Sequence, residues 1–256
     1  IFGLGYSAKA IKASLERMGW AVSATGRDGD LAFGDERQVR RALAAASHVL
    51  SSVPPEGDAD PVLERYGDAL GHGWLGYLSS SGVYGDTGGA WVDESAVIGS
   101  GRRTARAACD SAWLERGARV FRLPGIYGPG RSALERVRAG KAHRIDLPGQ
   151  VFSRIHVDDI GRVTQLAAAR TLAGTYNLSD DEPAPPQDLV TYAANLLGVP
   201  PPPEVPFEDA QMTEMARSFY ADNKRVSSKA IKAALGIDLL YPTYREGLEA
   251  IHRQHA

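Results

Sequence analysis

The sequence predicts an α/β fold, a doubly wound parallel sheet of the Rossmann type with a small C-terminal substrate lobe. Two observations support this prediction. Short apolar runs alternate with helical stretches, and glycine and proline cluster where the apolar runs end. The chain has 28 Gly and 15 Pro, and these residues allow the tight turns and close backbone approaches that ligand-binding loops need.

The first forty residues resemble one β-α-β unit. The chain starts in an apolar run, passes through a glycine turn and enters a helical period that ends at Gly19, a natural C-cap. A second apolar run over residues 20–24 completes the unit, and such a crossover implies parallel strands. The apolar residues of the helical period fall on one face, and they are Ala8, Ile11, Leu15 and Met18.

The same alternation continues along the chain. We expect further strands at 48–52, 74–79, 119–123 and 175–178. We expect further helices at 36–46, 61–70, 101–116, 132–139, 158–171, 187–197, 227–235 and 244–252. We expect residues 1–178 to form the dinucleotide-binding domain, with a lobe insertion near 128–150, and residues 179–256 to form the small lobe.

Composition excludes several classes of function. The 29 Lys and Arg balance 31 Asp and Glu, so no basic surplus is available for nucleic acid. The longest apolar runs fall short of the roughly 20 residues that cross a bilayer, and no signal segment opens the chain. We therefore expect a cytoplasmic protein without a membrane or nucleic-acid partner. The single Cys109 cannot form an internal disulfide, and the scattered histidines predict no metal site.

A dinucleotide fingerprint lies between the first strand and the first helix. In Gly3-x-Gly5-x-x-Ala8 the first glycine permits the turn, the second lets a diphosphate approach the backbone, and the small third residue lets the helix pack on the sheet. The helix N-terminus then presents free N–H groups to the phosphates. The residues expected to contact the cofactor are Gly3, Gly5, Tyr6, Ser7, Ala8, Arg27, Ser52, Val53, Pro54, Ser79 and Pro124.

The end of the second apolar run distinguishes NADP from NAD. An NAD enzyme of this plan carries an acidic residue there for the ribose 2′-hydroxyl, whereas this chain has Arg27. A guanidinium can bind a 2′-phosphate through two hydrogen bonds, which favours NADP. In the alternative, NAD is the cofactor, Arg27 is solvated, and Asp28 or Asp30 accepts the ribose hydroxyl.

Three segments resemble the extended, epimerase/dehydratase-like branch of the short-chain dehydrogenase/reductase superfamily. They are residues 78–86 (LSSSGVYGD), 122–130 (RLPGIYGPG) and 152–159 (FSRIHVDD). The resemblance covers the chain from Gly3 to about Asp180, and residues 223–228 (NKRVSS) fit it more loosely. It implies a nicotinamide cofactor, a small-molecule substrate and a homodimer formed through the helix at 101–116.

The resemblance also implies three catalytic side chains, of which this chain retains one. The hydroxyl residue that orients the substrate oxygen matches Ser80. The positions of the Tyr-x-x-x-Lys pair hold Arg102 and Arg106, so the member is atypical. Arg106 can keep a positive charge near the nicotinamide ribose, but a guanidinium with a pKa above about 12 does not exchange protons near neutral pH.

Two interpretations of this loss remain open. Either Tyr84 or Tyr127, both expected on loops at the carboxyl edge of the sheet, supplies the phenol with its pKa lowered by Arg106, or the protein binds the nucleotide without turning it over. Arg131 and Arg154 lie where the branch holds its substrate, and they suit a phosphate or a carboxylate.

The sequence thus predicts an NAD(P)-dependent oxidoreductase or a sugar-nucleotide epimerase/dehydratase-like enzyme that lacks the usual tyrosine. The alternative is a non-catalytic NAD(P)-binding regulatory or scaffold protein.

Overall fold

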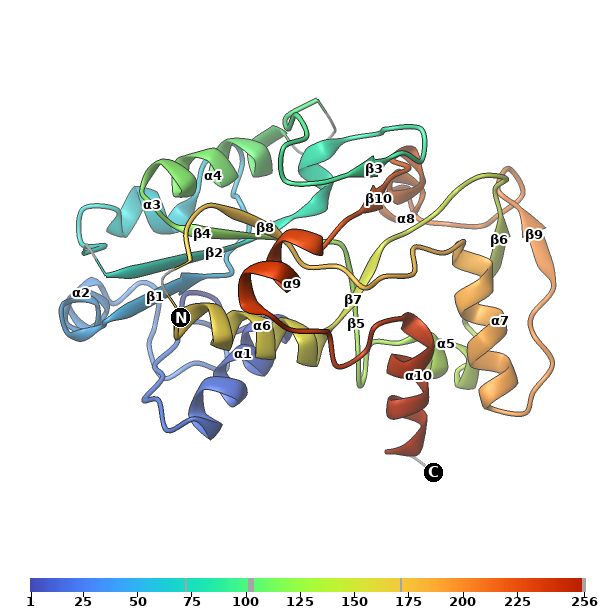
Figure 1. Ribbon diagram of the computed structural model, residues 1–256, viewed down its shortest axis with the longest axis horizontal. Coiled ribbons are helices and arrows are strands. Elements are labelled where there is room, and N and C mark those ends of the chain that lie inside the picture. The colour runs from blue at the N-terminus through green and yellow to red at the C-terminus, as the bar shows by residue number, and fades with distance from the viewer. Residues whose placement is uncertain (72, 101–103, 171, 255–256) are drawn as a thin grey trace.

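A four-stranded parallel sheet forms the centre of the molecule (Figure 1). The computed structural model describes residues 1–71, 73–100, 104–170 and 172–254. The strand order is β1-β2-β4-β8, and every neighbouring pair is parallel. The strands are β1 (His48–Ser51), β2 (Trp74–Ser80), β4 (Arg119–Leu123) and β8 (Thr175–Asn177).

The extended N-terminal residues continue this sheet beyond β1. The amide of Phe2 donates to the Leu50 carbonyl at 2.8 Å, and the Thr25 amide donates to the Ile1 carbonyl at 2.9 Å. The predicted strand at 20–24 is wrong in extent, because the bonds to residues 1–4 come only from its end: the Ser23 carbonyl accepts from the Ile1 amine at 2.7 Å, and Thr25 makes the others. Residues 1–4 lie between Thr25 on one side and β1 on the other. Successive strands are added on one side of this point before β1 and on the other side after it, so the order of the sheet reverses between residues 1–4 and β1. Ligands bind at such a switch point in doubly wound folds.

Helices cover both faces of the sheet, which confirms the predicted fold class (Figure 1). Adjacent strand residues point to opposite faces, so Val120 packs with one cluster and Phe121 with the other. One face is covered by α1 (Tyr6–Arg17), α6 (Val157–Ala168) and α9 (Lys229–Leu235). The other is covered by α2 (Glu36–Ala45), α3 (Pro61–Tyr66) and α4 (Thr104–Glu115).

A third hydrophobic cluster lies beside the sheet, on the side of the chain's C-terminal end (Figure 1). It joins α5 (Ala133–Arg138), α7 (Pro186–Leu196) and α10 (Tyr244–Arg253) around Tyr127. Three further pairs of short parallel strands lie outside the four-stranded sheet. The pairs are β5 (Gly125–Tyr127) with β7 (Arg154–His156), β6 (Arg144–Asp146) with β9 (Glu204–Pro206), and β3 (Trp91–Val92) with β10 (Arg225–Val226).

The remaining elements are short. They are η1 (Ser81–Tyr84), which follows β2 directly, and α8 (Glu214–Ser218) with η2 (Phe219–Ala221). A search of the described residues finds no helix with the length and apolar character needed to span a membrane.

Candidate functional site

The glycine turn before α1 has the shape that the fingerprint predicts. Gly3 has φ +79°, a conformation that L side chains rarely adopt, and a Cβ there would lie 3.1 Å from the Ser52 Oγ. A Cβ at Gly5 would meet nothing within 4 Å, so the space beside its backbone is open. Gly3 is therefore required by the turn, whereas Gly5 leaves an approach to the backbone free for a ligand.

The N-terminus of α1 has no side-chain cap, although the helix is 12 residues long. By contrast, a side chain caps α2 through Asp35, α3 through Asp60 and α10 through Thr243. The first-turn N–H groups of a helix need partners from outside it when no cap is present. Together with the positive end of the helix dipole, these groups make the turn fit the diphosphate of a dinucleotide.

The residues that distinguish NADP from NAD lie close to this turn. The Thr25 Oγ1 accepts a hydrogen bond from the Gly3 amide at 3.0 Å, which ties the end of the 20–24 run to the turn. Asp28 pairs with Lys9, whose hydrogen bond and charge hold the pKa of that carboxyl below its usual value. Asp30 accepts from the Ala24 amide at 2.6 Å. Both acids thus have protein partners, whereas Arg27 is exposed and has no carboxylate within ion-pairing distance in the described chain.

A cleft of about 330 Å³ opens at the carboxyl ends of β2 and β4. It brings together four residues that the sequence placed in the site, Ser80, Arg106, Pro124 and Arg131. Ser81, a neighbouring alternative to Ser80 in the sequence, also lines the cleft. Further lining residues were not predicted, and they include Phe152, Ser153, Phe219, Asp222 and Lys224.

Ser80 and Arg106 enter the cleft from two neighbouring elements. Ser80 ends β2, and its Oγ accepts from the Gly82 amide at 3.1 Å, which caps η1. Arg106 lies on α4, and its Nη1 donates to the Tyr77 hydroxyl at 2.9 Å. Its guanidinium lies 5.8 Å from the centre of the Tyr77 ring. Arg102, at the position of the expected tyrosine, is outside the described residues.

Lys224 is a cleft residue that the sequence did not identify. Its Nζ donates to the Gly85 carbonyl at 2.7 Å and lies 3.4 Å from the Asp222 carboxylate. Lys224 and Gly85 are 139 residues apart in the chain. The segment that holds Lys224 resembles the extended branch only loosely, so the one available signal was weak.

Tyr84 does not face the cleft. Its side chain is 2% exposed, and its hydroxyl donates to the Asn177 Oδ1 at 2.7 Å while it accepts from Arg122 at 3.0 Å. Burial raises the pKa of this phenol. Ser79 is also turned inward, because its Oγ donates to the Asp110 carboxylate at 2.7 Å. Tyr84 and Ser79 are therefore held in a buried polar network behind the cleft.

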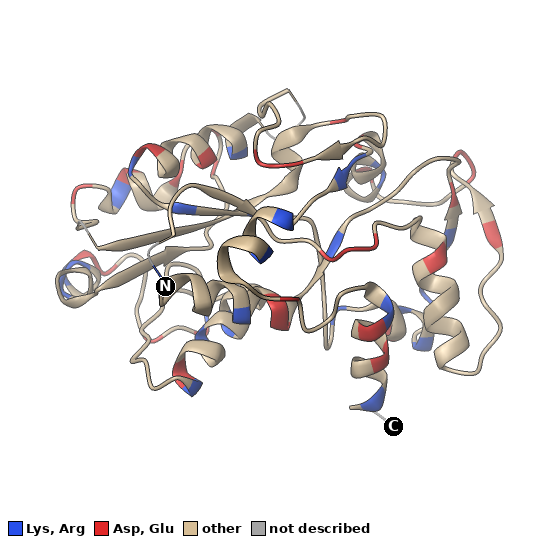
Figure 2. Ribbon diagram, in the orientation of Figure 1, with Lys and Arg blue, Asp and Glu red and all other residues tan. Residues whose placement is uncertain are grey.

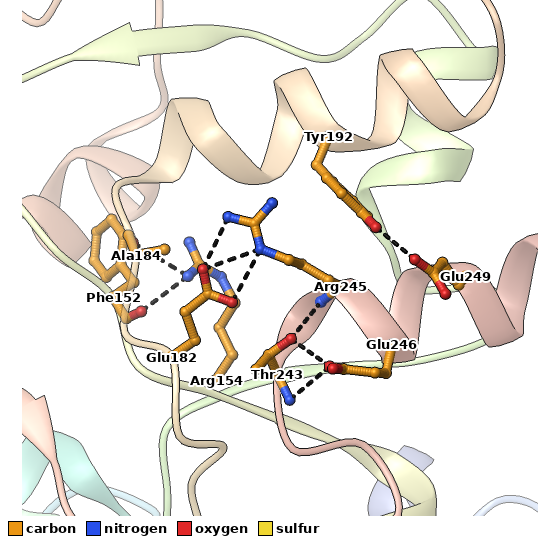
Figure 3. Close-up of polar contacts among 9 residues, drawn as sticks. All are labelled: Phe152, Arg154, Glu182, Ala184, Tyr192, Thr243, Arg245, Glu246 and Glu249. Carbon is orange, nitrogen blue, oxygen red and sulfur yellow. Dashed lines mark hydrogen bonds and ion pairs between the residues drawn. The ribbon is translucent and has the colours of Figure 1, made fainter.

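Tyr127 and Arg154 lie in the region of α7 and α10. The Tyr127 hydroxyl donates to the Thr243 carbonyl at 3.4 Å, and burial raises its pKa further from neutrality. Figure 3 shows Arg154 donating to two backbone carbonyls, those of Phe152 at 2.9 Å and Ala184 at 3.2 Å. Burial lowers the pKa of Arg154. Neither Tyr127 nor Arg154 lines the cleft, so the structure does not bring them together with Ser80.

Charge elsewhere on the molecule is mixed. Along α10 the basic residues lie at both ends and the acidic residues lie between them (Figure 2). Arg245 at its start pairs with Glu182 at 2.9 Å, as Figure 3 shows. No group of three or more His, Cys, Asp or Glu side chains in the part of the chain that the structure describes is arranged to hold a metal ion.

Comparison with known proteins supports the fold. No family model matches the chain. A functionally unknown conserved protein from Silicibacter pomeroyi is 41% identical, with a TM-score of 0.86 over 99% of this chain and 97% of that one. The human epimerase family protein SDR39U1, solved with NADPH, is 16% identical, with a TM-score of 0.77 over 98% of each chain.

A curated relative from Streptomyces sp. carries the name 3-diazoavenalumate denitrifying reductase. It is 29% identical over 140 residues, a match that includes 50% of this chain. The match covers 45% of that reductase, so this chain matches under half of its length.

Proposed function

This chain belongs to the same family as the functionally unknown conserved protein from Silicibacter pomeroyi and has the extended short-chain dehydrogenase/reductase fold, and from that premise we propose that it is an NAD(P)-dependent oxidoreductase or epimerase/dehydratase-like enzyme. One observation carries the proposal. The uncapped N-terminus of α1 lies at the same carboxyl edge of the sheet as a cleft lined by Ser80 and Arg106. We therefore propose a dinucleotide site at the glycine turn and a substrate site in the cleft, both at the carboxyl edge of the sheet.

The residues present fit the cofactor. Gly3 and Gly5 shape the turn, and the amides of Tyr6, Ser7 and Ala8, which have no side-chain cap, can donate to a diphosphate. The exposed Arg27 favours the 2′-phosphate of NADP, since both nearby acids already have partners. The predicted contacts from Ser52, Val53, Pro54 and Pro124 complete the proposal, which leaves out Ser79 because its hydroxyl is bonded to Asp110. When bound, the nicotinamide group supplies a hydride donor or acceptor.

The cleft supplies the polar groups that such a reaction needs. The Ser80 hydroxyl orients the substrate oxygen, and the Arg106 guanidinium stabilises negative charge on that oxygen or on the ribose side of the site. Lys224 adds a second cationic group to the lining of the cleft. Because Arg106 and Lys224 outnumber the Asp222 carboxylate among the described lining residues, the cleft favours a small substrate that carries a phosphate or carboxylate.

The known reductase relative supports the reductive direction. Its name describes reduction of 3-diazoavenalumate, and we extend to this chain only the broader class, hydride transfer to a small organic anion. Sugar nucleotides belong to the same panel of candidates, because their diphosphate would suit the same cations.

Turnover assays test the enzyme proposal. The protein is incubated with NADPH and a panel of carbonyl compounds, sugar nucleotides and aromatic carboxylates, while cofactor absorbance and product composition are followed. We expect turnover whose kcat falls about tenfold to a hundredfold in Ser80→Ala, since one oriented hydroxyl is lost. Ser47→Ala is the matched control, because Ser47 precedes β1 at the opposite edge of the sheet and its variant keeps full kcat.

One observation favours a second function, that of a non-catalytic NAD(P)-binding regulator or scaffold. Neither Tyr84 nor Tyr127 lines the cleft, and Arg106 replaces the lysine of the usual pair. Tight dinucleotide binding without any turnover across the panel would support that reading and contradict the enzyme proposal. Product analysis is part of the assay because an epimerase or dehydratase regenerates its cofactor without a net absorbance change.

A further inference from the structure

The turn at residues 128–131 packs directly on the first residue of α1. The Tyr6 hydroxyl donates to the Pro129 carbonyl at 2.9 Å. A Cβ at Gly128 would lie 2.6 Å from the same hydroxyl, so only glycine allows this contact, and its φ of +156° also disfavours a side chain. An antiparallel bridge between Gly128 and Arg131 closes the turn. The turn is therefore fixed against the glycine loop, 123 residues away in the chain.

Arg131 projects from this turn beside the N-terminus of α1. Its guanidinium carbon lies 5.6 Å from the centre of the Tyr6 ring, a cation–π distance. Burial raises the pKa of Tyr6 to about 12, and the charge of Arg131 opposes that rise, as expected for close neighbours. The ring of Tyr6, the first residue of α1, thus holds the guanidinium, and the N-terminus of this helix has no side-chain cap.

The Arg131 guanidinium makes no ion pair with a carboxylate of the described residues. Its side chain is exposed. Glu135 is nearby in sequence, but its carboxylate accepts hydrogen bonds from the amides of Gly130 at 3.0 Å and Ser132 at 2.8 Å. An exposed guanidinium that packs on the first residue of an uncapped helix is suited to an anion bound at that helix N-terminus.

We propose that Arg131 binds the diphosphate of the dinucleotide, and not the substrate, closing over it from the side opposite the glycine loop. This rests on the proposed function, because it requires that a dinucleotide binds at the turn. A guanidinium can form two parallel hydrogen bonds to phosphate oxygens. Because NAD and NADP share the diphosphate, Arg131 would add to the binding affinity of both cofactors. Arg106 and Lys224 are then left to hold the substrate.

Calorimetric titration of the whole chain with NADP⁺ and with NAD⁺ tests the inference. We expect Arg131→Met to raise the Kd of both cofactors at least tenfold, and Arg131→Lys to restore part of the loss. Arg27→Met raises only the Kd of NADP⁺, which separates the two arginines. Arg138→Met, which removes an exposed arginine of α5, is the control and changes neither Kd.

Salt dependence supplies a readout that a structural role would not move. A direct contact between charges weakens with ionic strength, so the rise of Kd with salt is steeper in the native protein than in Arg131→Met. If the Kd of Arg131→Met lies within twofold of the native value for both cofactors, the inference is overturned. If Arg131→Met raises only the KM of the substrate, Arg131 belongs to the substrate site. If the native chain binds neither dinucleotide, the proposed function fails as well.

Discussion

Two buried polar groups in this protein contain the same residue types but differ in how their charges are satisfied. The Asp110 network consists of Ser79, Tyr84, Asp110, Arg122 and Asn177, and it lies behind the cleft. The Asp180 cluster consists of Tyr127, Arg154, His156 and Asp180, beneath α10. Both contain an arginine, an aspartate and a tyrosine out of contact with water.

In the Asp110 network every charge has a partner. Arg122 donates to both oxygens of Asp110, at 2.8 and 2.9 Å, and also to the Tyr84 hydroxyl. Burial by itself would lower the pKa of Arg122, but its hydrogen bonds and ion pair with Asp110 raise it. The network is therefore a fully bonded ion pair at the working pH.

In the Asp180 cluster the arginine and the aspartate do not bond to each other. Arg154 donates to two backbone carbonyls, and neither carboxylate oxygen of Asp180 has a hydrogen-bond partner in normal geometry among the described residues. Burial raises the pKa of Asp180 to about 8, although the charge of Arg154 acts in the opposite direction. The comparison teaches that hydrogen bonding, and not burial alone, decides whether a buried acid stays ionised.

The largest effect is expected from Asp110→Asn. The substitution leaves the buried Arg122 without its counter-charge, so we expect the free energy of unfolding to fall by about 3–5 kcal/mol. Urea unfolding measures this loss. Asp68→Asn, which removes an exposed partner of Arg40, is the control and costs less than about 1 kcal/mol. A loss from Asp110→Asn no larger than that of the control would contradict the comparison.

The same substitution at Asp180 is expected to act with the opposite sign. The folded pKa of about 8 exceeds the unfolded value of about 3.9, so folded Asp180 keeps a proton that the unfolded chain releases. Native stability from this group is full below pH 4 and is lost as the pH rises toward 8. Asp180→Asn does not ionise, so we expect it to be more stable than the native protein at pH 8 by about 1–3 kcal/mol.

Urea unfolding of both proteins at pH 5 and pH 8 measures this difference. Comparison at equal pH removes the contribution of His156, whose folded pKa of about 4 gives the opposite slope between pH 4 and about 6.5. A stability difference that does not change between the two pH values would show that Asp180 is ionised in the folded protein.

The smallest effect is expected from the two tyrosines, each changed to Phe. Tyr84→Phe leaves one Arg122 N–H and the Asn177 oxygen without a partner, so we expect a loss of about 1–2 kcal/mol in the free energy of unfolding. Tyr127→Phe removes one long bond to Thr243 and costs less than about 0.5 kcal/mol. Thermal and urea unfolding compare the pair directly, and equal losses would remove the distinction between the two groups.

The sequence predicted most of the fold because secondary structure follows from local patterns. Glycine and proline marked where strands end, and apolar periodicity placed α1, α2, α4, α6 and α10 close to their observed bounds. The run at 20–24 was an exception, since it is apolar enough for a strand but bonds to residues 1–4 only through Ser23 and Thr25 at its end.

The cleft was harder to predict than the turn. Gly3 and Gly5 are read from a local motif, and their positions follow from the backbone conformation of a single loop. Arg131 and Arg154 looked equivalent in the sequence, yet one is exposed at the cleft and the other is 6% exposed beneath α10. No local pattern distinguishes them, because their burial depends on helices that come much later in the chain.

The sequence by itself determined the alternating strands and helices, the glycine turn and the replacement of the usual catalytic pair by arginines, because each depends on residues near one another in the chain. Only the tertiary structure decided that Lys224 joins Ser80 in the cleft, that Arg131 meets Tyr6, and that Tyr84 is held away from both. Those contacts join residues far apart in the chain, so they are set by how the helices pack around the sheet.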